Sequence, residues 1–309
     1  MNFDEFKERF IDEVKEIMEE DYLINVSPVK KNNETELTGL SARKPDSNIA
    51  PTIYLEQLYA DYLKGTTFES IVEETVRVLT DGQVSFDINL EMLDSYDYVK
   101  DKLMLKLINY ERNEAFLKKV PYKPFLDLAI VFYIMVGNSK YGDGSIIVNN
   151  DIYKEWNVEM EKMYADALQN TKSSLGIYIK DIWSVLKDIL QKSGREDENR
   201  AMEEEYGGLT ETNMYVVTNN YYCMGASVLL YDDVFKSLSE SCDGDLYVIP
   251  SSIHELVVLP ATGERDDSEG LLKMIKEVND TSVPGGEILS DNLYFYDREL
   301  NRFRCLQAS

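Results

Sequence analysis

The residues that could form a catalytic site lie in one short stretch, where the only histidine of the 309-residue chain follows two serines and precedes a glutamate. Ser251, Ser252, His254 and Glu255 offer hydroxyl nucleophiles, a base and an acid, which is the residue set of a serine hydrolase. Ser227 is a further candidate nucleophile, but leucine stands where a nucleophile elbow has its second glycine. These residues predict a hydrolase as one of two functional hypotheses.

The segments around His254 have the pattern of a β-hairpin. Residues 246–249 and 253–259 are apolar and β-branched runs of strand length, and residues 250–252 have turn chemistry. Adjacent residues on a strand point to opposite faces, so His254 and Glu255 are expected to share one site only at a bulge. This favours a structural histidine, hydrogen-bonded near the turn, over a catalytic one.

The sequence contains no motif for the common metal or nucleotide sites. One histidine and three scattered cysteines give no paired zinc ligands, and no calcium loop or phosphate-binding glycine motif is present. We therefore expect no metal and no cofactor, although the many acidic residues leave a magnesium or calcium site made of carboxylates alone as an open alternative. Tyr221 and Tyr222, with Glu255, are candidate binding residues, although tyrosines at the edge of a core have the same pattern.

The charge balance leads to the second hypothesis. With 57 Asp and Glu against 32 Lys and Arg, the formal charge is −25, which disfavours direct contact with nucleic acid or an anionic membrane. It favours a non-enzymatic binding or regulatory protein whose acidic surface engages a basic protein partner, including one that itself binds nucleic acid. An acidic composition that only keeps the protein soluble is the simpler alternative.

The N-terminal residues, the apolar runs and the cysteines indicate in which cellular compartment the protein lies. The N-terminal residues lack a basic region followed by an apolar core, and no run approaches the roughly 20 apolar residues of a membrane span. The three cysteines are an odd number without C-x-x-C spacing, which suits reduced thiols. We expect a cytoplasmic protein of bacterial type, and the sequence leaves its oligomeric state open.

The order of elements predicts an α+β protein with hairpins and packing helices, without regular β-α repetition. The helices that this expectation rests on most lie over 3–20, 53–63, 66–81, 160–168, 179–190 and 266–279, with a further short helix that Asn149, Asn150 or Asp151 can cap and that ends at Trp156. The expected strands are a hairpin of 22–26 and 35–43, strands over 103–108, 145–148 and 214–218, a single central strand over 125–136, and a last hairpin of 293–296 and 303–306. The acidic stretch 195–212 predicts a linker or loop, which divides the chain into an N-terminal domain, 1–194, and a C-terminal domain, 213–309.

Several segments together carry a resemblance to a known family: Leu107–Asn113, Val120-Pro121, Phe125–Phe132, Tyr215–Asn219, Gly225-Ala226, Gly244–Glu255 and Leu289–Asp291. On these residues the chain resembles an uncharacterised family of cytoplasmic proteins from anaerobic Gram-positive gut bacteria, over nearly its whole length. The family implies no reaction, ligand or catalytic residue. Its members often carry a histidine after the proline, where this chain has Tyr122, which puts in doubt any chemistry built on that position.

Overall fold

The structure is a computed structural model, which describes residues 1–18, 21–45, 51–81, 89–139, 142–192, 214–261 and 268–307. The chain forms two compact units. Unit 1 comprises Met1–Leu90 with Met135–Ile146, and unit 2 comprises Glu91–Ile134 with Ile147–Ser309. Both combine helices with antiparallel sheets, which confirms the predicted α+β class.

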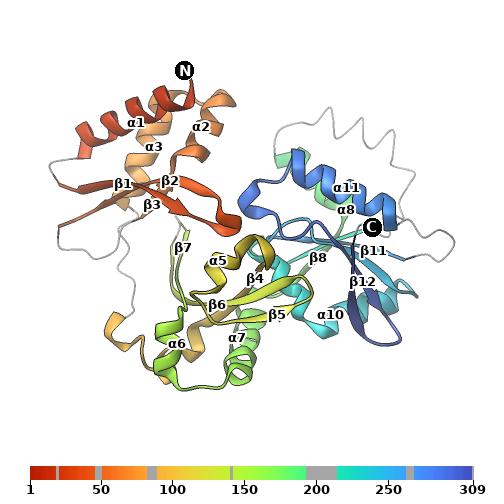
Figure 1. Ribbon diagram of the computed structural model, residues 1–309. Helices are drawn as coiled ribbons and strands as arrows, with labels where there is room; N and C mark the ends of the chain where they lie inside the picture. The colour runs from red at the N-terminus through yellow and green to blue at the C-terminus, as the bar shows by residue number, and fades with distance from the viewer. Residues whose placement is uncertain are drawn as a thin grey trace. The chain divides into compact units, whose positions relative to one another are not determined.

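Unit 1 places helices against a three-stranded antiparallel sheet in the order β1-β2-β3 (Figure 1). Its elements are α1 (Phe3–Met18), β1 (Leu23–Lys30), β2 (Glu36–Arg43), β3 (Thr52–Tyr54), α2 (Leu55–Leu63) and α3 (Phe68–Asp81). In α1, Phe6, Phe10 and Val14 repeat at helical spacing and are fully buried. They pack against Leu40 and Phe68, so the apolar stripe of the sequence becomes the core of the unit.

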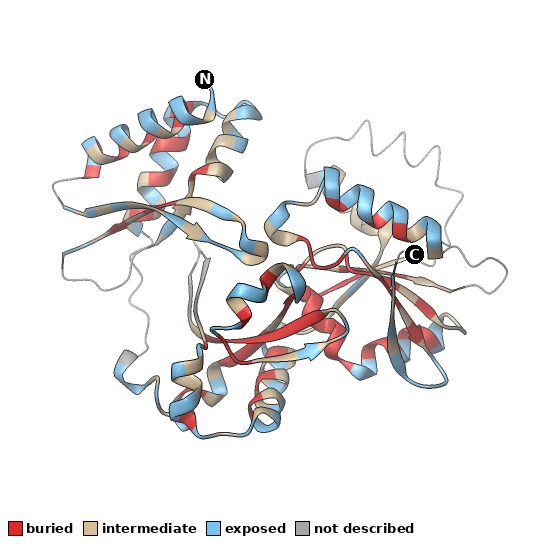
Figure 2. Ribbon diagram, in the orientation of Figure 1, coloured by how far each residue is buried: buried red, intermediate tan, exposed pale blue. Residues whose placement is uncertain are grey.

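The smaller sheet of unit 2 has β6 at its centre. Strand β6 (Leu128–Ser139) pairs with β4 (Leu103–Asn109) and β5 (Tyr122–Phe125), and β7 (Gly142–Ile147) also pairs with β6. The end of β6 from Met135 and residues 142–146 of β7 belong to unit 1. Figure 2 shows burial along both β4 and β6. Nearby helices are α4 (Tyr96–Val99), α5 (Glu114–Leu117), α6 (Asn150–Trp156) and α7 (Met160–Leu175). As predicted, the Asn149 side chain caps α6 by accepting from two backbone N–H groups.

The larger sheet of unit 2 has six antiparallel strands in the order β13-β12-β10-β11-β9-β8. Its elements are β8 (Tyr178–Asp181), α8 (Ile182–Lys192), β9 (Tyr215–Thr218), the 3₁₀ helix η5 (Gly225–Leu230), α10 (Asp232–Ser241), β10 (Leu246–Ile249), β11 (Leu256–Pro260), α11 (Ser268–Thr281), β12 (Leu293–Asp297) and β13 (Arg302–Leu306). Both predicted hairpins, β10–β11 and β12–β13, are confirmed.

Several predicted elements differ from the structure. The helix expected over 53–63 begins at Leu55, because residues 52–54 pair with β2 as strand β3. The single strand over 125–136 is a hairpin, because Leu126 adopts a φ of 54° and the chain reverses between Phe125 and Leu128. The run is apolar apart from Asp127, and this one charged residue does not by itself predict a turn. The helix expected over 179–190 begins at Ile182, because the preceding four residues pair with β9 as strand β8.

The acidic stretch predicted as a linker, 195–212, lies outside the described residues. The strands on its two sides, β8 and β9, are neighbours in the larger sheet. None of the helices in the described part of the chain is long and apolar enough to cross a membrane.

Candidate functional site

His254 lies in a connection between two strands of the larger sheet, not on a strand. Strand β10 ends at Ile249 and β11 begins at Leu256, so the second strand starts three residues later than predicted. The backbone N–H of Ser252 donates to the carbonyl of Glu255 across this connection, at 3.2 Å. His254 and Glu255 therefore lie outside the strands, so their side chains are not required to point to opposite faces of the sheet.

The hydrogen bonds of the imidazole determine where its proton lies. Nδ1 of His254 accepts the backbone N–H of Met224 at 3.2 Å, so the neutral ring holds its proton on Nε2. Nε2 is 3.9 Å from Oε1 of Glu287. In a Ser-His-Asp triad Nε2 accepts the serine proton and Nδ1–H donates to the carboxylate. Here Nδ1 is the acceptor, from the backbone of Met224, so the ring does not have that arrangement.

The three candidate nucleophiles do not meet the imidazole. The hydroxyl of Ser252 accepts the backbone N–H of His254 at 3.0 Å, and the buried hydroxyl of Ser227 donates to the carbonyl of Met224 at 3.0 Å. Ser251 donates its backbone N–H to the carbonyl of Ile249. Among the hydrogen bonds of the described residues, none joins a serine hydroxyl to the ring. The hydrolase hypothesis therefore stays a prediction without geometric support.

His254 instead fastens the loop of residues 219–224. The buried side chain of Asn219 accepts from the backbone N–H of Tyr221 at 2.9 Å and donates to the carbonyl of Cys223 at 2.7 Å. Tyr222 and Met224 have φ values of 54° and 52°. Residues other than glycine rarely adopt positive φ values of this kind. The bond from Met224 to His254 thus helps to hold a strained backbone.

The candidate binding residues have different environments. Tyr221 and Tyr222 are 57% and 52% exposed, and the ring of Tyr222 lies 5.0 Å from that of Tyr178. Burial raises the pKa of Glu255, while the charge of the neighbouring His254 acts in the opposite direction. Whether these residues bind a partner stays a prediction.

A polar cluster around Asp127 escaped the sequence analysis. Asp127 lies in the β5–β6 turn, where Oδ2 accepts from the hydroxyl of Ser290 at 2.5 Å and from the amide of Asn292 at 2.9 Å. Oδ1 accepts from the fully buried hydroxyl of Tyr294 at 2.7 Å. The single sequence signal was a charged residue inside an otherwise apolar run. The carboxylate is committed to these donors and joins the two sheets of unit 2.

A second set of contacts extends this cluster. The buried amide of Asn109 donates to the carbonyl of Leu289 at 3.0 Å, and Arg112 pairs with Asp291 at 2.6 Å. Asn279 donates to Oδ1 of Asp291 at 2.8 Å. Three of the segments that carry the sequence resemblance, around residues 109, 127 and 290, therefore converge at one place.

A pocket of about 650 Å³ lies beside Asp127. We call it the tyrosine pocket; it is lined by Tyr110, Glu111, Glu114, Tyr122, Pro124, Leu126 and Asp127. The rings of Tyr110 and Tyr122 meet edge to face with centroids 5.8 Å apart, and their hydroxyls are 3.4 Å apart. The lining thus combines aromatic rings with three carboxylates, and none of its described members is a cation.

The cysteines should differ in reactivity. Burial and the adjacent Asp127 carboxylate raise the pKa of Cys305 to about 12, and burial raises that of Cys242, whereas Cys223 is exposed. Because the thiolate is the reactive form, we expect iodoacetamide to alkylate Cys223 first and Cys305 last in the folded protein. Peptide mass spectrometry over time measures the order. Labelling in concentrated guanidinium chloride is the control, and equal rates for Cys223 and Cys305 in the folded state would contradict the assignment.

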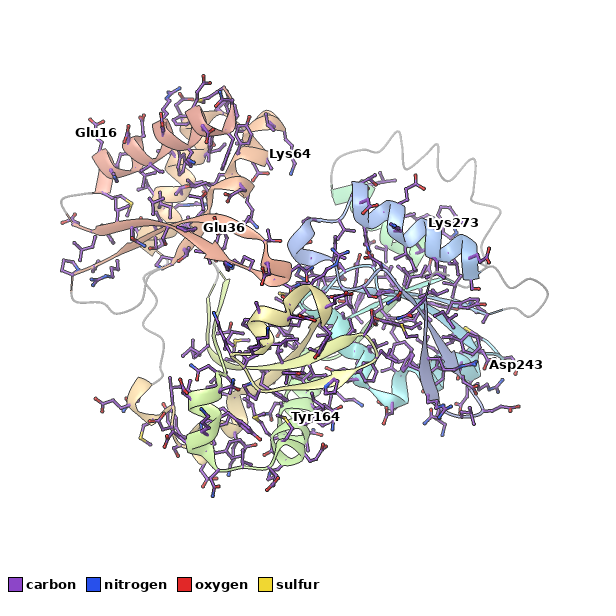
Figure 3. The ribbon with its side chains drawn as sticks, viewed as in Figure 1. Glu16, Glu36, Lys64, Tyr164, Asp243 and Lys273 are labelled. Atoms are coloured by element: carbon purple, nitrogen blue, oxygen red, sulfur yellow. The ribbon has the colours of Figure 1, made fainter. Side chains whose placement is uncertain are left out.

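Helix α1 carries a row of exposed carboxylates in unit 1. They are Asp4, Glu5, Glu8, Asp12, Glu13 and Glu16. Figure 3 shows Glu16 pointing outward from the helix. Lys7 pairs with Asp4, and Arg9 pairs with Glu69. Within the part of the chain that the structure describes, no cation lies at ion-pair distance from the carboxylates at positions 8, 12, 13 and 16.

The described residues contain no group of three or more His, Cys, Asp or Glu side chains placed to hold a metal ion. In the comparison with known proteins, the model of a family of unknown function (DUF5688) matches residues 3–298. No curated protein and no solved structure matches the chain.

Proposed function

Since the chain belongs to a family of unknown function (DUF5688), we propose its function from its own residues: it is a binding protein that takes a lysine or arginine side chain of a protein partner into the tyrosine pocket. The observation that carries this proposal is the pairing of two tyrosine rings with carboxylates in a pocket without a cation among its described lining residues. The proposal makes the chain a non-enzymatic protein.

The pocket suits a cation for two reasons. A cation within about 6 Å of an aromatic ring gains roughly 0.5–2 kcal/mol from the ring quadrupole, and both Tyr110 and Tyr122 offer rings. Glu111 and Glu114 are exposed, and no cation among the described residues pairs with them. Their charge is therefore available to a ligand. Leu126, which is 36% exposed, adds apolar surface for the methylene stem of a lysine or arginine.

The charge of the whole molecule supports the same partner. A formal charge of −25 attracts a basic protein from a distance, and the exposed carboxylates of α1 contribute to this attraction. Attraction of this kind depends on salt, because the Debye length falls from roughly 30 Å at 0.01 M to about 8 Å at 0.15 M ionic strength.

The test is binding of a fluorescent lysine- and arginine-rich peptide to charge variants, followed by anisotropy at low and physiological salt. The Glu111→Gln/Glu114→Gln variant should weaken binding by about fivefold or more through lost charge attraction. Lys118 lines an adjoining pocket together with Tyr110 and Glu114, so Lys118→Gln should strengthen binding. Misfolding would lower the affinity of both variants. Opposite changes in affinity therefore show that the charge of the substituted residues is the cause.

The matched control is Glu155→Gln/Glu277→Gln, which removes the same charge from two other exposed positions of unit 2. We expect less than about a twofold change in affinity from this control. A glutamine-rich peptide of the same length should not bind. Equal losses in the pocket variant and in the control would show that only net charge matters and would reject the tyrosine pocket as the site.

A further inference from the structure

The larger sheet and helix α11 enclose a groove of about 860 Å³. We call it the α11 groove; it is lined by Tyr247, Ser268, Glu269, Leu272, Lys273, Lys276, Phe295, Arg304, Cys305, Leu306 and Gln307. Leu272 packs with Leu293 beneath it as part of a local core. The volume lies within the range of about 300–1,000 Å³ that is usual for small-molecule sites.

The strand side of the groove is a ladder of three neighbouring residues. Tyr247 stands opposite Phe295, and Phe295 stands opposite Arg304, on the adjacent strands β10, β12 and β13. Directly paired residues share one face of a sheet. The rings of Tyr247 and Phe295 are 5.7 Å apart, and the guanidinium of Arg304 lies 4.6 Å from the centroid of Phe295.

The helix side of the groove supplies two lysines. Glu269, Lys273 and Lys276 are spaced by four and three residues, so they lie along one face of α11. Figure 3 shows Lys273 on this helix. Both lysines are exposed, and in the described part of the chain neither has a carboxylate at ion-pair distance. Arg304 is 3.8 Å from Asp297 and remains 53% exposed.

The positive charge of this groove is opposite in sign to the net charge of the protein. Three cations and one carboxylate are among the described lining residues, in a chain with a formal charge of −25. At physiological ionic strength charges beyond about 8 Å are largely screened. The local cations therefore determine which small ions enter the groove, even though a long polyanion is repelled by the chain as a whole.

We propose that the α11 groove binds a small organic phosphate with a planar ring, such as a nucleoside monophosphate. The phosphate lies between Lys273, Lys276 and Arg304, and the ring lies on the apolar surface of Tyr247 and Phe295. Lysine and arginine are the usual partners of phosphate oxygens, and aromatic side chains accept the face of any base. This site is separate from the tyrosine pocket, because it uses the opposite charge and shares none of its described lining residues.

The experiment is calorimetric titration of the full chain with AMP, adenosine and inorganic phosphate as separate probes. We expect AMP to bind more than about tenfold tighter than either adenosine or phosphate, because only AMP engages both halves of the groove. Binding should weaken as salt increases. No detectable AMP binding, or equal affinity for AMP and adenosine, would overturn the proposal, and equal affinity for AMP and phosphate would overturn the role of the rings.

The lysines are tested by Lys273→Gln/Lys276→Gln against Lys154→Gln/Lys236→Gln, which changes the same charge at two exposed residues outside the groove. The groove variant should lose at least about tenfold in AMP affinity and the control less than about twofold. Circular dichroism should show both variants folded, since all four side chains are exposed. Retained AMP affinity in the folded groove variant would overturn the proposal.

Discussion

Gly225→Ala should destabilise unit 2 by about 3 kcal/mol or more, because overpacking a rigid site forces the backbone to move. A Cβ at Gly225 would lie 2.0 Å from Oγ1 of Thr218 and 2.3 Å from the carbonyl oxygen of His254. These two atoms are themselves joined by a hydrogen bond of 2.7 Å. The added methyl group therefore separates the loop of residues 219–224 from the connection that holds His254.

Urea denaturation followed by tryptophan fluorescence measures this loss. The two tryptophans of the chain, Trp156 and Trp183, both belong to unit 2, so the signal reports that unit. Gly244→Ala is the control, since the nearest heavy atom to its Cβ is the carbonyl oxygen of Cys242 at 4.0 Å. We expect the control to change the free energy of unfolding by less than about 1 kcal/mol. Similar midpoints for the two variants would contradict the close packing at Gly225.

Asp127→Ala should cost about 3 kcal/mol or more, because it removes one charged acceptor from several buried donors at once. The hydroxyl of Tyr294 is fully buried and, among the described residues, donates to Asp127. Ser290 is also fully buried and donates to the same carboxylate. Without the carboxylate these hydroxyls lose the partner that offsets their removal from water. The same urea and fluorescence measurement applies.

Two further variants isolate the cause. Asp101→Ala removes an exposed carboxylate from the same unit and should change stability by about 0.5 kcal/mol or less. Tyr294→Phe removes one donor and should cost about 1 kcal/mol in the native background. In the Asp127→Ala background it should cost less, since its partner is already gone. Additive losses would show that Tyr294 and Asp127 are not coupled.

The local sequence pattern was sufficient to predict helices and strands that bury one face and expose the other. The spacing of Phe6, Phe10 and Val14 predicted α1, and this helix does bury those three residues. Alternation and turn residues predicted the β1–β2 hairpin, and the acceptor side chain of Asn149 predicted the cap of α6. These signals succeed because the interactions that produce them join residues close together in the chain.

Local sequence pattern did not predict elements whose hydrogen-bond partners lie far away in the chain. The turn at Leu126 and Asp127 is stabilised by Ser290, Asn292 and Tyr294, more than 160 residues away. The single local signal is Asp127 itself, a charged residue in an otherwise apolar run, and it does not indicate where in the chain its partners lie. Strand β8 was predicted as helix for the same reason, since its pairing with β9 crosses the acidic stretch.

The sequence by itself determined the α+β class, the excess of negative charge and the positions of most elements, because composition and periodicity are properties of neighbouring residues. Only the tertiary structure decided what His254 contacts, and it assigned the ring to the backbone of Met224 and away from the serine hydroxyls. It also decided that rings and carboxylates line one pocket of unit 2, and that rings and cations line another. Both pockets are built from strands and helices whose contacts are set by long-range packing, which no stretch of sequence expresses alone.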